Sequence, residues 1–269
     1  MMTRSSGFSP GSPRMAETNL DILWPAFLAG LIVLATHVPL GRLVLDRGIV
    51  FIDLAIAQVA GLGVVVADFL GWEPNGWSVQ VAAIAAALLA AGFLIWTERR
   101  LALLQEALIG VVFVVAASAE VILFGFNPHG AEHLKDLLVG QILWVTIPQL
   151  APVAALYAIV LVTLSFVDMR RRRALFYGLF AVTVTASVQL VGVFLVFASL
   201  IIPALAARIA GAERALLFAY AFGLIGYILG LLSSALADFP SGAAIVCALA
   251  LMLAGTLALH AWSGRPMVG

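Results

Sequence analysis

The strongest constraint in this sequence is a series of apolar runs that are long enough for helices to cross a bilayer. A bilayer core about 30 Å thick needs roughly 20 consecutive apolar residues in a helix. Such runs lie near residues 22–41, 49–71, 77–97, 103–125, 149–167, 174–207, 215–237 and 243–262. With 64% hydrophobic residues and a mean hydropathy of +1.13, the chain is predicted to be an all-α integral membrane protein, a polytopic bundle of eight or nine transmembrane helices.

The long run at 174–207 decides between eight and nine crossings. Lysine and arginine concentrate in short cytoplasmic loops of membrane proteins. If this run crosses twice, with a turn near Gly192, and the N-terminus lies outside, most of the 14 basic residues fall on the cytoplasmic side. A single tilted crossing would put Arg208 and Arg214 outside. Nine crossings are therefore favoured, with eight as the alternative.

The segments outside the apolar runs are short. Residues 1–20 are rich in Ser, Pro and Gly and lack the apolar segment of a cleaved signal peptide, so a flexible tail is expected, with Met15 as an alternative start. A single transmembrane domain over 21–264 and a short C-terminal tail at 265–269 complete the predicted organisation. The net formal charge is zero, which gives no reason to expect a nucleic-acid partner. The single cysteine, Cys247, excludes an internal disulfide.

Acidic side chains inside the apolar runs carry most of the functional information, because each costs free energy in lipid unless it faces a partner or water. The set is Asp53, Asp68, Glu106 and Glu120. Asp53 is expected about one and a half turns into its helix, either on a transport path or in an ion pair with Arg42 or Arg47. Glu106 is expected near the inner face. Asp68 and Glu120 are expected near outer helix ends, where snorkelling or interfacial water would solvate them.

The histidines suggest a zinc protease only at first sight. The segment "HGAEH" (129–133) matches H-x-x-E-H, in which two histidines one helical turn apart bind zinc and a glutamate activates water. A proline and a glycine at this point break a helix, which disfavours the protease. We expect His129, Glu132 and His133 in a solvated external loop or at a metal entry site. His37 and His260, in the first and last spans, are expected to pack or to form hydrogen bonds.

Several short motifs follow the order and spacing of one transporter family. They are "PAFLAG…PLG" before the first basic loop, "EALIG" (106–110), "LLVGQILWVT" (137–146), "LVGVFLVFASLIIPALAAR" (190–208) and "DFPSG" (238–242). Over most of residues 22–262 the chain resembles the membrane-spanning permease of ABC-3 type importers for zinc, manganese and iron.

The resemblance implies a homodimeric channel in the cytoplasmic (inner) membrane of a bacterium. The implied partners are a cytoplasmic ABC ATPase and a periplasmic or extracellular metal-binding protein. No Walker A phosphate loop occurs in the sequence, so ATP hydrolysis is assigned to the partner and no enzymatic activity is expected. No permanently bound cofactor is implied, because zinc or manganese is the transported ion.

The segment "FIDLAIAQVAGLG" (51–63) departs from the family pattern F-x-G-D-x-[ILV]-[SA]-H-[AS], whose Asp and His are expected to meet the metal. Aligned without gaps, Asp53 falls on the family's Gly and Gln58 on its His. Five residues separate these side chains by about 140° around a helix, which disfavours a chelate made by those two alone. An amide oxygen is also a poorer zinc ligand than imidazole. Asp53 remains the candidate metal ligand, and Gln58, Glu106 and Glu120 complete the predicted translocation path.

A second departure lies between the fifth and sixth spans. The family usually has a coupling helix there, of D-x-x-x-A-x-x-x-G type, that docks on the ATPase, whereas this chain passes from "SFVD" directly into "MRRRRALFYG". Asp168 is expected as the remnant of that segment. The residues expected either to contact the ATPase or anionic lipid, or only to fix the topology, are Arg170, Arg171, Arg172 and Arg173. The alternative function is therefore a degenerate permease that acts as a structural or regulatory membrane subunit without ATP-coupled transport.

Overall fold

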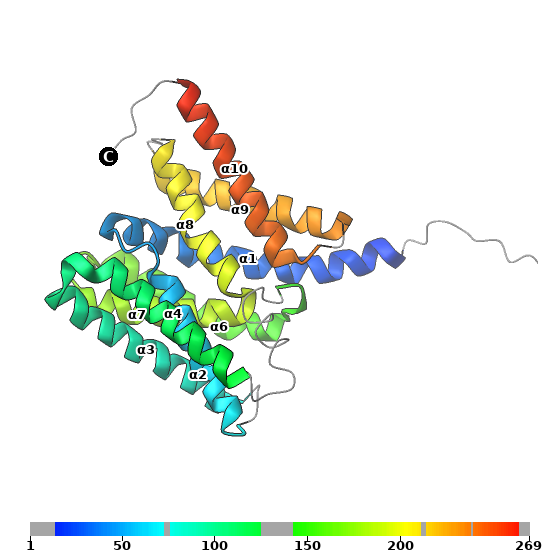
Figure 1. The fold of residues 1–269 in the computed structure, drawn as a ribbon. Coiled ribbons are helices and arrows are strands. Elements are labelled where there is room, and N and C mark those ends of the chain that lie inside the picture. The colour runs from blue at the N-terminus through cyan, green and yellow to red at the C-terminus, as the bar shows by residue number, and fades with distance from the viewer. Residues whose placement is uncertain (1–13, 73–75, 125–141, 211–213, 238, 264–269) are drawn as a thin grey trace, which may run out of the picture.

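The computed structural model describes residues 14–72, 76–124, 142–210, 214–237 and 239–263, which form nine α-helices and no strand (Figure 1). The helices are α1 (Arg14–Arg47), α2 (Ile52–Phe69), α3 (Trp77–Arg100), α4 (Gln105–Phe124), α6 (Ile147–Phe166), α7 (Arg173–Val191), α8 (Val193–Ile209), α9 (Ala215–Ala237) and α10 (Ser241–Ser263). Eight helical segments are long and apolar enough to cross a membrane, and α8 is a shorter apolar helix. The predicted all-α polytopic bundle is confirmed.

The apolar run at 174–207 is divided into two helices at Gly192. This glycine has φ 81° and ψ 161°, a conformation that is open almost only to glycine. The α7 helix begins next to the end of α3, because Arg173 pairs with Glu98. The α8 helix leads into α9, whose Leu216 shares a pocket with Asp46 at the same end of the bundle. The α7 and α8 helices thus run in opposite directions, as the nine-crossing hypothesis requires.

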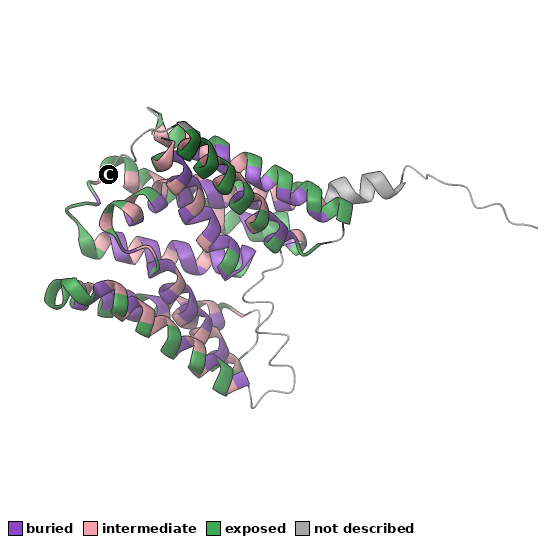
Figure 2. Ribbon diagram, turned by 45° about the horizontal axis from the view of Figure 1, so that its top comes forward, coloured by how far each residue is buried: buried purple, intermediate pink, exposed green. Residues whose placement is uncertain are grey.

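The helices differ in how deeply they are buried. In α7, 61% of the span is buried, and in α1 and α2 56%, whereas the values are 17% for α6 and 22% for α4 and α10. Figure 2 shows the buried residues gathered inside the bundle, with exposed residues along its outer faces. Since many exposed side chains of the outer helices are large and apolar, these faces suit contact with lipid or with another protein.

The first connection is tighter than the apolar runs suggest. The α1 helix extends to Arg47, beyond the run at 22–41, and Gly48 ends it with φ 68°. The α2 helix then begins only at Ile52. This late start places the polar residues of α2 closer to the first turn of the helix than expected.

Between α6 and α7, residues 167–172 form a direct connection without a helix. Val167 follows the last residue of α6, and Arg172 precedes the first residue of α7. The coupling helix expected from the resemblance is therefore not formed by these residues.

Candidate functional site

Asp53 lies in the first turn of α2, not one and a half turns into the helix as the sequence had suggested. Its side chain is buried, with 1% of the residue exposed, and neither carboxylate oxygen has a hydrogen-bond partner among the described residues. The first N–H groups of a helix lack intrahelical partners, and the positive end of the helix dipole favours a carboxylate there. Helix position thus compensates part of the cost of burying this charge.

The ion pair considered for Asp53 is not formed with Arg47. The Arg47 guanidinium donates a hydrogen bond to the Met169 carbonyl at 2.7 Å and lies 3.9 Å from a carboxylate oxygen of Glu98. It also lies 4.3 Å from the centre of the Phe176 ring, a cation–π contact. These neighbours engage Arg47, and no ion pair joins it to Asp53 among the described residues.

Gln58 and Glu120 form a buried pair between α2 and α4. The Gln58 amide nitrogen donates a hydrogen bond to one Glu120 carboxylate oxygen, and the two residues are 4% and 1% exposed. The expectation that Glu120 is solvated at an outer helix end is wrong, because the carboxylate turns inward against α2. Its second oxygen, Oε1, has no hydrogen-bond partner among the described residues.

A glycine lets the Glu120 carboxylate reach α2. A methyl group placed on Gly61 would lie 2.7 Å from Oε1 of Glu120, which is closer than such atoms approach in proteins. Gly61 is therefore needed for close approach and not for an unusual backbone angle. Small residues commonly allow this kind of contact between membrane helices.

The α2 and α4 helices run in the same direction. Near the start of α4, the Glu106 carboxylate lies against the backbone of Phe51, the residue before α2. Further along, Glu120 meets Gln58 and Gly61. The contact between these two helices therefore carries Glu106 at the end where both helices begin, beside the first turn of α2, and the Gln58–Glu120 pair further along.

These residues do not form a dense metal centre. Within the described part of the chain there is no group of three or more His, Cys, Asp or Glu residues placed to hold one metal ion. Asp53 as a metal ligand therefore stays a prediction. The predicted entry residues, His129, Glu132 and His133, lie outside the described residues.

The arginine run between α6 and α7 pairs with carboxylates of the same chain. Arg170 pairs with Asp46 of α1 at 2.7 Å, and Arg171 pairs with Asp168 at 3.3 Å. Arg173 pairs with Glu98 at 3.6 Å. Arg172, the last residue before α7, is exposed.

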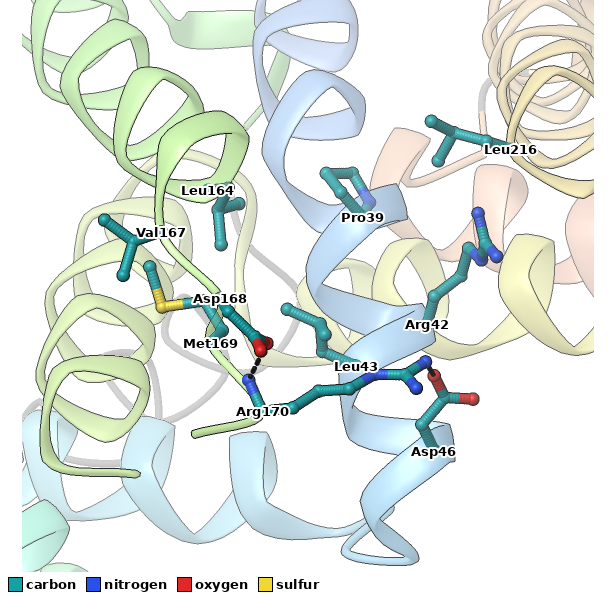
Figure 3. Close-up of a pocket in the computed structure, with 10 residues that line it drawn as sticks. All are labelled: Pro39, Arg42, Leu43, Asp46, Leu164, Val167, Asp168, Met169, Arg170 and Leu216. Atoms are coloured by element: carbon teal, nitrogen blue, oxygen red, sulfur yellow. Dashed lines mark hydrogen bonds and ion pairs between the residues drawn. The ribbon is translucent and has the colours of Figure 1, made fainter. Parts of the chain in front are cut away.

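A pocket of about 300 Å³ opens beside this connection, between the ends of α1 and α6 and the start of α9 (Figure 3). Its lining residues are Pro39, Arg42, Leu43, Asp46, Leu164, Val167, Asp168, Met169, Arg170 and Leu216. Figure 3 shows Arg170 reaching across from the connection to Asp46 on α1. Both signs of charge are thus presented at the end of the bundle where an ATPase contact is predicted.

Glu98 is a structural residue that the sequence interpretation missed. Its carboxylate is the common partner of Arg47 and Arg173, so it links the ends of α1 and α3 to the start of α7. In the sequence it stands in "TERR" at the end of an apolar run, where a charged residue looks like an ordinary helix boundary. The only signal was the presence of an acidic residue in an otherwise basic loop.

The comparison with protein families decides the assignment. The model described as the ABC 3 transport family matches residues 19–171 and 166–260. The chain belongs to the ABC 3 transport family. This confirms the resemblance seen in the sequence motifs and makes the chain a membrane transport subunit. The two matched segments overlap at residues 166–171, from the last residue of α6 into the connection to α7.

Individual relatives agree with the family assignment. The high-affinity zinc uptake system membrane protein ZnuB of Haemophilus influenzae is 25% identical over 247 residues, covering 84% of this chain and 93% of the relative. Among solved structures, PsaBC from Streptococcus pneumoniae in complex with Fab has a TM-score of 0.71 at 22% identity, covering 90% of this chain and 95% of that one. An inward-facing metal-chelate type ABC transporter has a TM-score of 0.66 at 17% identity, with 95% and 91% coverage. The structural similarities show that the fold is shared.

Proposed function

We propose that this chain is the permease subunit of an ABC importer that moves a divalent transition metal across the cytoplasmic membrane of a bacterium. Zinc or manganese is the proposed ion, with iron as a further candidate. The observation that carries the proposal is the row of polar residues along the α2–α4 contact in a chain of the ABC 3 transport family. The name of the H. influenzae relative, a zinc uptake protein, gives additional support.

The chemistry of this row suits a transported cation. Carboxylate and amide oxygens can replace part of the hydration shell of a divalent metal. Asp53 and Glu120 each have a buried oxygen without a partner in the described residues. A path with few ligands at each step favours release, because an ion that is held too firmly would not leave.

The proposed assembly has two copies of this chain, cytoplasmic ABC ATPases and an external metal-binding protein. ATP hydrolysis by the partners would drive alternating access at the dimer axis. The exposed Asp168 and Arg170 to Arg173 are the proposed ATPase contact, since they lie on the connection that replaces the coupling helix.

The second candidate function is a structural or regulatory membrane subunit without ATP-coupled transport. Two observations favour it: the short connection at 167–172 and the glutamine at the position of the family's histidine. It predicts that the chain neither supports metal accumulation nor associates with an ABC ATPase.

The deciding experiment measures cellular zinc, manganese and iron by mass spectrometry under chelator limitation. A deletion strain carries the wild-type chain, Asp53→Ala, Asp68→Ala or an empty vector. Asp68 lies in the last turn of α2, so its variant is a matched control on the same helix. Restoration of one metal by wild type and Asp68→Ala but not by Asp53→Ala supports the permease with Asp53 on its path.

If wild type restores no metal, the permease proposal fails, and purification from the membrane tests the second candidate. The absence of an ABC ATPase from the purified chain would agree with the subunit role. Restoration of metal by Asp53→Ala at the wild-type level would keep the permease and remove Asp53 from the path.

A further inference from the structure

A second group of buried polar side chains lies where α1, α6 and α7 meet, away from the α2–α4 contact. We call His37, Tyr157, Thr183 and Ser187 the central polar cluster; all four residues are at most 2% exposed. The Tyr157 hydroxyl donates to the Thr183 carbonyl at 3.2 Å and contacts the Ser187 hydroxyl. The His37 ring lies 6.4 Å from the Tyr157 ring, centre to centre.

The hydrogen bonds of His37 define the role of each ring nitrogen. Nδ1 lies 2.9 Å from the Val33 carbonyl oxygen, which can only accept, so Nδ1 carries the hydrogen and donates it. Nε2 then has a free lone pair. It is buried and has no hydrogen-bond partner among the described residues. This arrangement, with one nitrogen fixed on a backbone carbonyl, is typical of histidines that bind metal ions through the other nitrogen.

Thr183 has a second buried group without a partner. Its backbone carbonyl accepts from Tyr157, but its own hydroxyl oxygen has no hydrogen-bond partner among the described residues. Leaving a buried polar group unpaired destabilises the folded chain. Tyr157 contacts both residues that carry such a group, since its ring lies near the His37 ring and its hydroxyl donates to the Thr183 carbonyl. Two unpaired buried groups next to one side chain indicate a place for a bound water or ion.

The depth of His37 fits a position on a path through the membrane. It precedes the end of α1 at Arg47 by ten residues, about 15 Å along a helix, which is near the middle of a bilayer core. Ionisable residues at this depth generally mark ion pathways or binding sites. The cluster contains one imidazole and no carboxylate, so it would bind a cation weakly and release it readily.

We propose that the central polar cluster is a second binding site for a divalent transition metal, with Nε2 of His37 as its nitrogen ligand and the Thr183 hydroxyl beside it. The proposal rests on the proposed transport function. Imidazole favours zinc and similar transition metals over magnesium and calcium. The cluster would therefore discriminate among cations at a point separate from Asp53.

The transport test compares wild type, His37→Gln and Thr183→Val in the chelator-limited strain. Valine has nearly the shape of threonine and removes a hydroxyl that has no protein partner, so a purely structural Thr183 predicts unchanged or higher thermal stability and unchanged metal uptake. A metal-binding cluster predicts lower uptake in both variants, with Thr183→Val as stable as wild type. Wild-type uptake in both variants would overturn the proposal.

A binding test separates this site from the transport function. The chain has four histidines, so replacing His129, His133 and His260 by alanine leaves His37 as the only imidazole. The full-length variant, purified without a histidine tag and loaded with zinc, is measured by X-ray absorption. Imidazole scattering that disappears with His37→Gln supports the site, even if wild type restores no metal in cells. Failure to bind zinc, or a spectrum unchanged by His37→Gln, would contradict it.

Discussion

The Glu120 carboxylate depends on single atoms of two neighbours on α2. Gln58 donates a hydrogen bond to it, and Gly61 leaves room for it because glycine has no side chain. An unpaired buried carboxylate is far more costly than an exposed one, because the protein interior solvates charge poorly. Changes of one or a few atoms at these positions should therefore have large effects.

Gly61→Ala is expected to destabilise the protein by about 1–3 kcal/mol, because the added methyl group displaces Glu120 and breaks its bond to Gln58. The matched control is Gly110→Ala on α4, where no atom lies within 4 Å of the added carbon. The control should be as stable as wild type or more stable, since alanine favours helix. Thermal unfolding in detergent measures both. Equal melting temperatures for Gly61→Ala and wild type would show that the close approach is not needed.

A double-mutant cycle tests whether Gln58 and Glu120 act as a pair. Gln58→Leu leaves a buried carboxylate without its donor and should lower stability more than the combined Gln58→Leu, Glu120→Leu change, which removes both polar groups. Unfolding of the two single variants and the double variant gives the coupling free energy. Additive effects would mean that the two side chains do not depend on each other.

Among the elements, the division between α7 and α8 was largely predictable, whereas the α2–α4 contact was not. The distribution of arginines along the sequence favoured a turn near Gly192, because basic residues prefer one side of the membrane. Nothing comparable fixes which helix faces α2. The partner of Glu120 depends on which small residues let two helices approach, and Asp53 was misplaced because hydropathy does not reveal where a helix starts.

Gly192→Ala tests the turn between these two helices. At φ 81° and ψ 161° a residue with a side chain is strained by about 1–3 kcal/mol, so the variant should melt at a lower temperature than wild type. Gly178→Ala on α7, where a methyl group meets nothing within 4 Å, is the matched control and should be stable. If both variants have the same melting temperature, the backbone at Gly192 is not constrained in the way that the structure indicates.

At the scale of the whole molecule, the fold class and the family could be predicted from the sequence. The lengths of the apolar runs, the positions of the basic loops and the order of the motifs were sufficient. The packing at the end of the bundle expected to be cytoplasmic could not be predicted, because carboxylates from α1 and α3 pair there with Arg170 and Arg173. Such pairs form between segments more than 70 residues apart, so only the folded chain brings them together.

The number of crossings can be measured directly by labelling single cysteines in intact cells. In a Cys247→Ser background, Trp72→Cys lies between α2 and α3 and Arg214→Cys lies directly before α9; both native residues are exposed. With nine crossings and the N-terminus outside, a membrane-impermeant maleimide should label position 72 in intact cells but position 214 only after permeabilisation. If α7 and α8 together made a single crossing, position 214 would be outside and labelled in intact cells. That result would reverse α9 and α10 and contradict the antiparallel arrangement of α7 and α8.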